Sequence, residues 1–166
     1  AIRVERHTRQ PPSGQEVVVE KVTLDMNGDG VPDYVDATVQ PWHVYLGIPP
    51  RDGQNGGFLT EPVSWPGTAW EMMPELTVGL GFERRSTGGS QETTDFTVMD
   101  MNGDGVPDWV SANGGAWTVL LGKTGCAVDR VIRGDRSGCG FNVAFQWVSG
   151  VRVLVPNFDA PQITPV

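Results

Sequence analysis

The sequence contains little of the side-chain chemistry on which most enzymes depend. Its 166 residues include two histidines, His7 and His43, and two cysteines. No G-x-S-x-G, H-x-x-H or C-x-x-C motif occurs, which excludes the common serine-hydrolase, metalloprotease and dithiol sites. His43 alternates with Trp42 and Val44 along an expected strand, so we interpret it as a surface residue. The sequence therefore predicts no catalytic residues and a protein that is not an enzyme.

Long apolar runs and basic clusters are also lacking. No apolar stretch approaches the roughly 18 residues of a transmembrane helix, so we expect no membrane insertion. The formal net charge is −8 with 12 lysines and arginines, and these form no basic patch of the kind that binds nucleic acid. The sequence begins with Ala1 instead of methionine, so we expect a processed product or a piece of a longer protein.

Few long segments are free of glycine and proline, because the chain has 22 glycines and 13 prolines. The segments that are, around residues 17–24 and 93–99, are rich in β-branched residues, which favour strands. Apolar residues alternate with other residues from Trp42 to Leu46, a pattern typical of a half-buried strand. The one candidate helix, residues 68–73, is cut by Pro74. The sequence predicts an all-β, antiparallel fold with very little helix.

One twelve-residue segment occurs almost twice, as residues 25–36 (DMNGDGVPDYVD) and 100–111 (DMNGDGVPDWVS), at an offset of 75. Its core, D-x-N-G-D-G-x-x-D, places oxygen-bearing side chains at positions 1, 3, 5 and 9, and glycine at positions 4 and 6 allows a tightly wound loop. Calcium takes about six to eight oxygen ligands. We predict two Ca²⁺ sites, with these ligands: Asp25, Asn27, Asp29, Val31 (carbonyl) and Asp33; Asp100, Asn102, Asp104, Val106 (carbonyl) and Asp108.

The alternative for either segment alone is a polar hairpin turn, since Asn-Gly and Asp-Gly are common turn dipeptides. Two copies that both keep every ligand position favour calcium. A helix–loop–helix site would need an acid at position 12, where the second copy has Ser111, and proline stands at position 8 of both copies. We therefore expect the loops 25–33 and 100–108 to connect strands.

The repeat extends beyond the loops. Residues 42–47 (WHVYLG) match 117–122 (WTVLLG), and residues 58–65 resemble 141–147, with eight more residues before the second segment. Upstream, residues 2–6 are similar to residues 80–84. Each unit reads strand, turn, strand, calcium loop, strand, short turn, strand, long turn, strand. We predict two tandem antiparallel β-blade repeats of β-propeller type, at residues 1–79 and 80–166.

The loop motif followed by an aromatic residue, then W-x-V-x-L and a later G-F and W, resembles the FG-GAP/VCBS calcium-binding repeats. These are blades of integrin α-chain propellers and of many secreted bacterial proteins. The closest likeness is to repeats in Rhs-type and toxin-complex B-component shell proteins. It covers residues 17–65 and 92–147. The resemblance implies the calcium ligands given above and no catalytic residues. Gly47 and Gly122 depart from it, because those shell repeats usually carry asparagine there.

Cys126 and Cys139 bracket the extra residues of the second unit, and we predict that they form a disulfide across a long surface loop (126–139). A disulfide and calcium loops together indicate an exported protein, secreted or at the cell surface. The same loop contains Arg133-Gly134-Asp135, a tripeptide that integrins recognise on constrained loops. We expect a solvated turn there and keep an integrin-ligand role as the alternative.

Three functions are consistent with these features. We expect a non-enzymatic, calcium-stabilised β-repeat module that serves as scaffold, shell or protein-interaction surface. Its expected partners are other blades of a parent protein, copies of itself or other subunits. The first alternative is a carbohydrate-binding or adhesive module that uses exposed tryptophans and binds a glycan or cell-surface protein; we expect the tryptophans to be core residues instead. The second is part of a secreted propeller enzyme such as a polysaccharide lyase.

Overall fold

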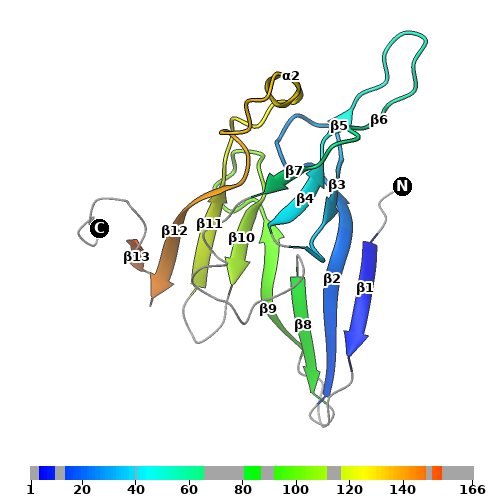
Figure 1. Cartoon of the computed structure of the whole chain (residues 1–166). Coiled ribbons are helices and arrows are strands. Elements are labelled where there is room, and N and C mark those ends of the chain that lie inside the picture. Colours follow the sequence, from blue (N-terminus) through cyan, green and yellow to red (C-terminus); the bar gives the residue numbers. More distant parts are fainter. Residues whose placement is uncertain are drawn as a thin grey trace.

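The computed structural model describes residues 4–9, 14–39, 41–65, 81–86, 92–111, 117–148 and 151–154. These residues form antiparallel strands and one short helix (Figure 1), which confirms the all-β prediction. The first strands are β1 (Val4–Arg9), β2 (Gly14–Leu24), β3 (Asp33–Asp36), β4 (Trp42–Tyr45), β5 (Gly47–Ile48), β6 (Gly57–Phe58) and β7 (Val63–Trp65). The others are β8 (Gly81–Ser86), β9 (Glu92–Met99), β10 (Asp108–Ser111), β11 (Trp117–Gly122), β12 (Phe141–Val148) and β13 (Val151–Leu154), with helix α2 (Val128–Ile132) before β12.

Eleven strands form one sheet in the order β13-β12-β11-β10-β9-β8-β2-β3-β4-β7, with β1 paired to β2. Strands β5 and β6 form a separate pair. Within the described residues the large sheet is open, because no pairing joins β7 to β13. The described strands thus establish an antiparallel sheet, and the propeller assignment stays a prediction. The division at residues 79 and 80 lies outside the described residues.

The pairing of β8 to β12 repeats that of β1 to β7. Both loops are flanked by strands, as predicted, and the strand pairs on either side of the loops match at the offset of 75. The predicted correspondence of residues 58–65 with 141–147 also holds in the pairing. The matching Cα partners are Val35↔Val44 with Val110↔Val119, Gly47↔Phe58 with Gly122↔Phe141, and Trp42↔Trp65 with Trp117↔Trp147.

The correspondence predicted upstream, between residues 2–6 and 80–84, was wrong by one residue. Thr8 pairs with Val17 and Arg85 pairs with Glu92, so the first strands of the two units match at an offset of 77 instead of 78. Both hairpins also contain a register shift at the same place, between Glu5 and Arg6 and between Phe82 and Glu83. The short similarity between the two segments could not fix this register, because the number of residues between the paired positions differs between the units.

The two units are joined through the first half of β2. Strand β8 pairs with it from Gly14↔Ser86 to Val19↔Gly81. The second half of β2 pairs with β3, and β1 covers residues 16–22 of β2 along the other side. Strand β8 therefore lies between β2 and β9 and carries the sheet from one unit into the next (Figure 1).

The core is shared by both units. Trp42, Trp65 and Trp109 are almost completely buried in one cluster, and Phe141 of the second unit packs edge-on against Trp42 and Trp65 of the first. The ring centroids of these two pairs are 5.6 and 6.5 Å apart. Burial confirms that Trp42 is a core residue, whereas the side chains of Trp117 and Trp147 lie outside the described part. Buried and half-buried residues alternate along β3 and β4, as expected for strands with one face on a core.

The predicted disulfide between Cys126 and Cys139 is present, with Cα atoms 4.5 Å apart. The bridged segment is not wholly a loop, because it contains helix α2. Residues 127–133 have neither glycine nor proline, and Val131 of α2 is buried in the shared core. The bridge therefore fixes an insertion that contributes to the core. In the described part of the chain, no helix is long and apolar enough to cross a membrane.

Removing the bridge should destabilise the fold. A disulfide restricts the unfolded chain, and for a loop of this size the chain-entropy model gives about 3 kcal/mol. We predict that Cys126→Ala together with Cys139→Ala lowers the free energy of unfolding by about that amount, measured by urea denaturation. The wild-type chain under reducing conditions is the control and should behave alike. An unchanged urea midpoint in both would contradict the prediction.

Candidate metal centre

The first repeated loop is wound around the carboxylate of Asp25. Its Oδ1 accepts hydrogen bonds from the backbone N–H groups of Gly28 (2.8 Å) and Asp29 (3.2 Å), and its Oδ2 accepts one from Gly30 (2.8 Å). Gly28 and Gly30 have φ angles of 75° and 84°, which side chains other than glycine rarely adopt. The two glycines thus let the chain turn its N–H groups toward position 1 of the loop.

The second loop repeats this geometry. Asp100 accepts hydrogen bonds from the N–H groups of Gly103 (2.7 Å) and Gly105 (2.9 Å), whose φ angles are 79° and 86°. These bonds lower the pKa of the exposed Asp100 carboxyl below its usual range, the bond from Gly105 most strongly. Position 1 is therefore held as a carboxylate in the second loop.

Positions 3 and 5 are paired in the same way in both loops. Asn27 Nδ2 donates to Asp29 Oδ2 (2.9 Å), and Asn102 Nδ2 donates to Asp104 Oδ2 (2.9 Å). The other oxygen of each aspartate accepts the backbone N–H of position 7, Val31 or Val106, at 2.8 Å. The side chains of positions 1, 3 and 5 thus all take part in the loop that the repeated motif predicted.

Position 9 ties each loop to the strand that follows. Asp33 is fully buried, and its oxygens accept the N–H groups of Met26 and Gly47, both at 2.7 Å. Asp108 is also fully buried and accepts those of Met101 and Gly122, both at 2.8 Å. One carboxylate therefore satisfies two backbone donors that lie far apart in the sequence.

Burial raises the pKa of Asp33 to about 6, and the negative charges of Asp29 and Asp25 act in the same direction. The pKa of Asp108 is raised for the same reasons, with Asp104 and Asp100 as the charged neighbours. The hydrogen bonds from the backbone oppose these effects in both loops. Each loop therefore brings three aspartates close enough to repel one another, a repulsion that a bound cation would relieve.

The described residues contain no group of three or more His, Cys, Asp or Glu side chains already arranged around a metal position. The loop carboxylates are directed at backbone N–H groups instead. An ionised carboxylate has about four acceptor positions, and Asp29 and Asp33 each use two of them in the bonds above. Lone pairs thus remain for a cation, and the donor set of carboxylates, amide oxygens and carbonyls has the chemistry that calcium takes.

The structure explains why glycine stands at positions 47 and 122, which the sequence did not reveal. A Cβ on Gly47 would collide with the Pro32 carbonyl and lie 2.6 Å from Val31 Cγ1. A Cβ on Gly122 would lie 2.5 Å from both Pro107 O and Val106 Cγ1. The loop thus lies in close contact with the strand that follows it. The recurrence of glycine at both positions was the sequence signal for this contact.

The two loops also contact each other, which the sequence did not predict. A Cβ on Gly28 would lie 3.0 Å from Val106 Cγ2 and 3.2 Å from the Gly105 carbonyl oxygen. The first loop therefore packs against positions 6 and 7 of the second. The two predicted calcium sites therefore lie at the same end of the molecule.

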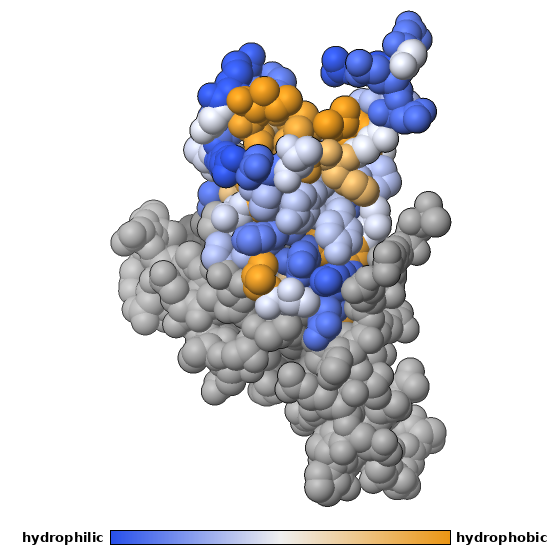
Figure 2. Space-filling view, turned by 45° about the vertical axis from the view of Figure 1, so that its right-hand side comes forward, coloured by the Kyte–Doolittle hydropathy of each residue, from blue (hydrophilic) through white to orange (hydrophobic). Residues whose placement is uncertain are grey.

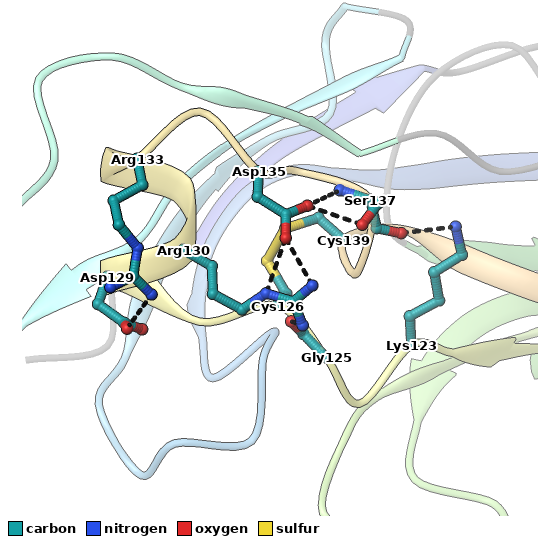
Figure 3. A network of polar contacts seen from close by, with 9 residues as sticks. All are labelled: Lys123, Gly125, Cys126, Asp129, Arg130, Arg133, Asp135, Ser137 and Cys139. Carbon is teal, nitrogen blue, oxygen red and sulfur yellow. Dashed lines mark hydrogen bonds and ion pairs between the residues drawn. A yellow bond between two sulfur atoms is a disulfide. The ribbon is translucent and has the colours of Figure 1, made fainter.

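The insertion is held by a network of its own (Figure 3). Asp135 Oδ2 accepts hydrogen bonds from Arg130 Nε (2.9 Å) and Nη2 (2.6 Å), and Oδ1 accepts the N–H (3.1 Å) and hydroxyl (2.7 Å) of Ser137. Arg133 pairs with Asp129 at 2.8 Å. The two charged residues of Arg133-Gly134-Asp135 are thus both paired within the insertion, and their side chains are partly exposed.

A cleft of about 720 Å³ lies between the first loop and the insertion. Asn27 and Asp29 line one side, and Val128 and Ile132 of α2 line the other, with Arg51 also at its wall. Ile132 is 68% exposed. In Figure 2, apolar surface (orange) borders hydrophilic residues (blue) in the upper part of the molecule, at the height where Figure 1 places α2. The cleft is open and mixed in polarity, and it contains no catalytic arrangement among its lining residues.

Comparison of the chain with protein-family models, curated proteins and solved structures gives no significant match. The resemblance to FG-GAP/VCBS repeats therefore rests on the loop and strand residues alone.

Substitution of Gly47 tests the close approach of loop and strand. We predict that Gly47→Ala destabilises the fold by about 1–3 kcal/mol, since the added methyl group overpacks a rigid backbone contact. The matched control is Gly57→Ala, because a Cβ at Gly57 would meet nothing within 4 Å. Thermal and urea unfolding should show a loss of stability for Gly47→Ala only. Equal stability of the two variants would refute the proposed contact.

The network around Asp135 predicts a pH dependence. Hydrogen bonds from Ser137 and then Arg130 lower the pKa of Asp135 to about 2. Since the folded pKa lies below the unfolded value of 3.8, the stabilisation is present above about pH 4 and is lost as the pH falls through 2. We predict that carboxyl NMR titration finds the low pKa and that Ser137→Ala raises it toward 3.8. Arg136→Ala is the control, and an equal rise there would contradict the account.

Proposed function

We propose that this protein is a non-enzymatic, calcium-stabilised β-repeat module of an exported protein, and that it serves as a scaffold and protein-interaction surface. The observation that supports it most is the repeated loop geometry. In both loops position 1 gathers backbone N–H groups, positions 3 and 5 pair, and position 9 is buried. Hydrogen bonds within the loops use only part of the acceptor capacity of these side chains, and the remaining oxygens are of the kind that calcium takes.

Calcium would be held by the side chains of positions 1, 3, 5 and 9 and by the carbonyl of position 7, with these residues: Asp25, Asn27, Asp29, Val31 and Asp33; Asp100, Asn102, Asp104, Val106 and Asp108. When bound, the ion would neutralise the mutual repulsion of three carboxylates in each loop. The residues themselves would then order the end of the molecule where the two loops meet.

We further propose that the units are blades of the FG-GAP/VCBS type. The repeated strand pairings, the calcium-loop motif and the tryptophan-bearing strands support repeats of this type. The pairing of β8 with β2 differs from a propeller of separate blades, because it joins the two units into one sheet. The disulfide supports export, because such bridges persist mainly in oxidising compartments. The carbohydrate-binding alternative gains no support from Trp42, Trp65 and Trp109, because these three side chains are buried.

Chelation tests the calcium proposal. With affinities typical of extracellular modules, about 10⁻⁵ to 10⁻³ M, millimolar calcium should add roughly 0.5–3 kcal/mol of stability at each site. We predict that a chelator lowers the melting temperature and that Asp29→Ala with Asp104→Ala abolishes this response. The matched control is Asp52→Ala, an exposed aspartate outside both loops. A melting curve that is the same in calcium and in chelator would sink the proposal.

A further inference from the structure

The first unit binds the second unit through one side of β2. The second unit carries the equivalent surface on β9. In the first unit, the outer side of β2 is occupied twice, by β3 from Lys21 onward and by β8 from Gly14 to Val19. In the second unit, β10 occupies the equivalent side of β9 from Phe96 onward. Among the described strands, none pairs with that side of residues 92–95, which correspond to residues 17–20. Within the described strands, one half of this β-ladder therefore has no partner.

Apolar side chains next to this open half differ in the same sense. Met26 belongs to the shared core and is fully buried, whereas Met101, its equivalent at the offset of 75, is 38% exposed. Leu24 packs against the core, whereas its equivalent Met99 is 44% exposed. Large exposed apolar side chains on the same strand and loop as an unpaired strand half are consistent with an interaction surface.

The loops give a third, independent difference. Gly28 packs against Gly105 and Val106 of the following unit, whereas a Cβ on its equivalent, Gly103, would meet nothing within 4 Å. In the described part of the chain, the strand half, the two methionines and the loop glycine of the second unit are thus less covered than their equivalents in the first unit. We define this surface, made of residues 92–95, Met99, Met101 and Gly103, as the open face.

The complementary surface lies at the other end of the sheet. Strand β8 uses one side for β9 and the other for β2. Strand β1, its equivalent, pairs with β2 on one side, and no described strand pairs with the other. The first unit therefore offers in β1 the element that fills the open half of a ladder like that of β2.

We propose that the open face of the second unit binds β1 of a second copy of this chain, so that the large sheet continues from copy to copy. This rests on the proposed scaffold function and names its partner. Strand β8 already makes the equivalent pairing with β2 between the two units, so this pairing is compatible with the loops and the core.

The internal interface also fixes the register. Val17 pairs with Glu83 and Val18 with Phe82. Offsets of 75 for β2 and 77 for β1 translate these into Glu92 opposite Arg6, and Thr93 opposite Glu5, in the partner copy. Opposite charges at directly facing positions favour an antiparallel pair. Such a head-to-tail contact uses two different surfaces, so it produces a closed ring or an open filament.

Cysteine crosslinking tests the register in the full chain. Directly opposed antiparallel residues have Cα atoms about 4.5–5.5 Å apart, a separation that a disulfide spans. We expect mixed Glu5→Cys and Thr93→Cys proteins to form a covalent heterodimer on mild oxidation, seen on a non-reducing gel. Glu5→Cys mixed with Thr94→Cys is the matched control, because a one-residue slip points the side chains to opposite faces.

Val18→Cys with Phe82→Cys in one chain is the positive control and should bridge internally. If it does so while the Glu5 and Thr93 variants crosslink no better than the slipped pair, or if the chain sediments as a monomer at every concentration, the second-copy proposal is overturned. If Val18→Cys and Phe82→Cys do not bridge, the proposal is overturned too, because the register between copies is derived from this pairing. The melting shift in chelator is measured separately, so the calcium proposal stands or falls independently.

Discussion

A buried aspartate at the end of each loop is the interaction on which both units depend. Asp33 and Asp108 each accept two backbone N–H groups, one from the start of the loop and one from the strand that follows. Without either carboxylate, two N–H groups would be left unsatisfied, at a cost of about 1–3 kcal/mol each. The same carboxylate is costly to ionise where it lies, because it is buried and has two acidic neighbours. A cation at the loop would remove that conflict and keep the tether.

These hydrogen bonds of the buried aspartate explain why the two loops have the same geometry although the surroundings of the two units differ. They fix the loop against its own strands, so loop geometry is the same in both units. The contacts between units include the pairing of the first half of β2 with β8, the approach of the glycine at loop position 4 to the second loop, and the packing of Phe141 on Trp42. Within the described residues, the half of β2 and the loop glycine are covered by a neighbouring unit in the first unit, and their equivalents are more exposed in the second. Repeats that keep the same local geometry and are stabilised through contacts with their neighbours are suited to a scaffold.

Much of this could be predicted from the sequence, because the informative residues recur. The loops, their flanking strands, the Trp42 strand and the disulfide follow from the offset of 75, from alternation and from the cysteine positions. The register of β1 was missed by one residue, since the similarity there is short and the number of residues between the paired positions differs between the units. Helix α2 was missed because five residues carry little periodic signal. The contact between the loops and the role of Gly47 depend on backbone approach, which local patterns do not encode.

The number of calcium ions bound per chain decides whether the two repeated loops are metal sites. Isothermal titration calorimetry of the metal-free chain should find two Ca²⁺ ions bound per molecule. Asp104→Ala should reduce this to one, and Asp29→Ala with Asp104→Ala should reduce it to none, while Asp52→Ala should leave it at two. Absence of calcium binding to the folded wild-type chain, or an unchanged stoichiometry in the double variant, would contradict the account.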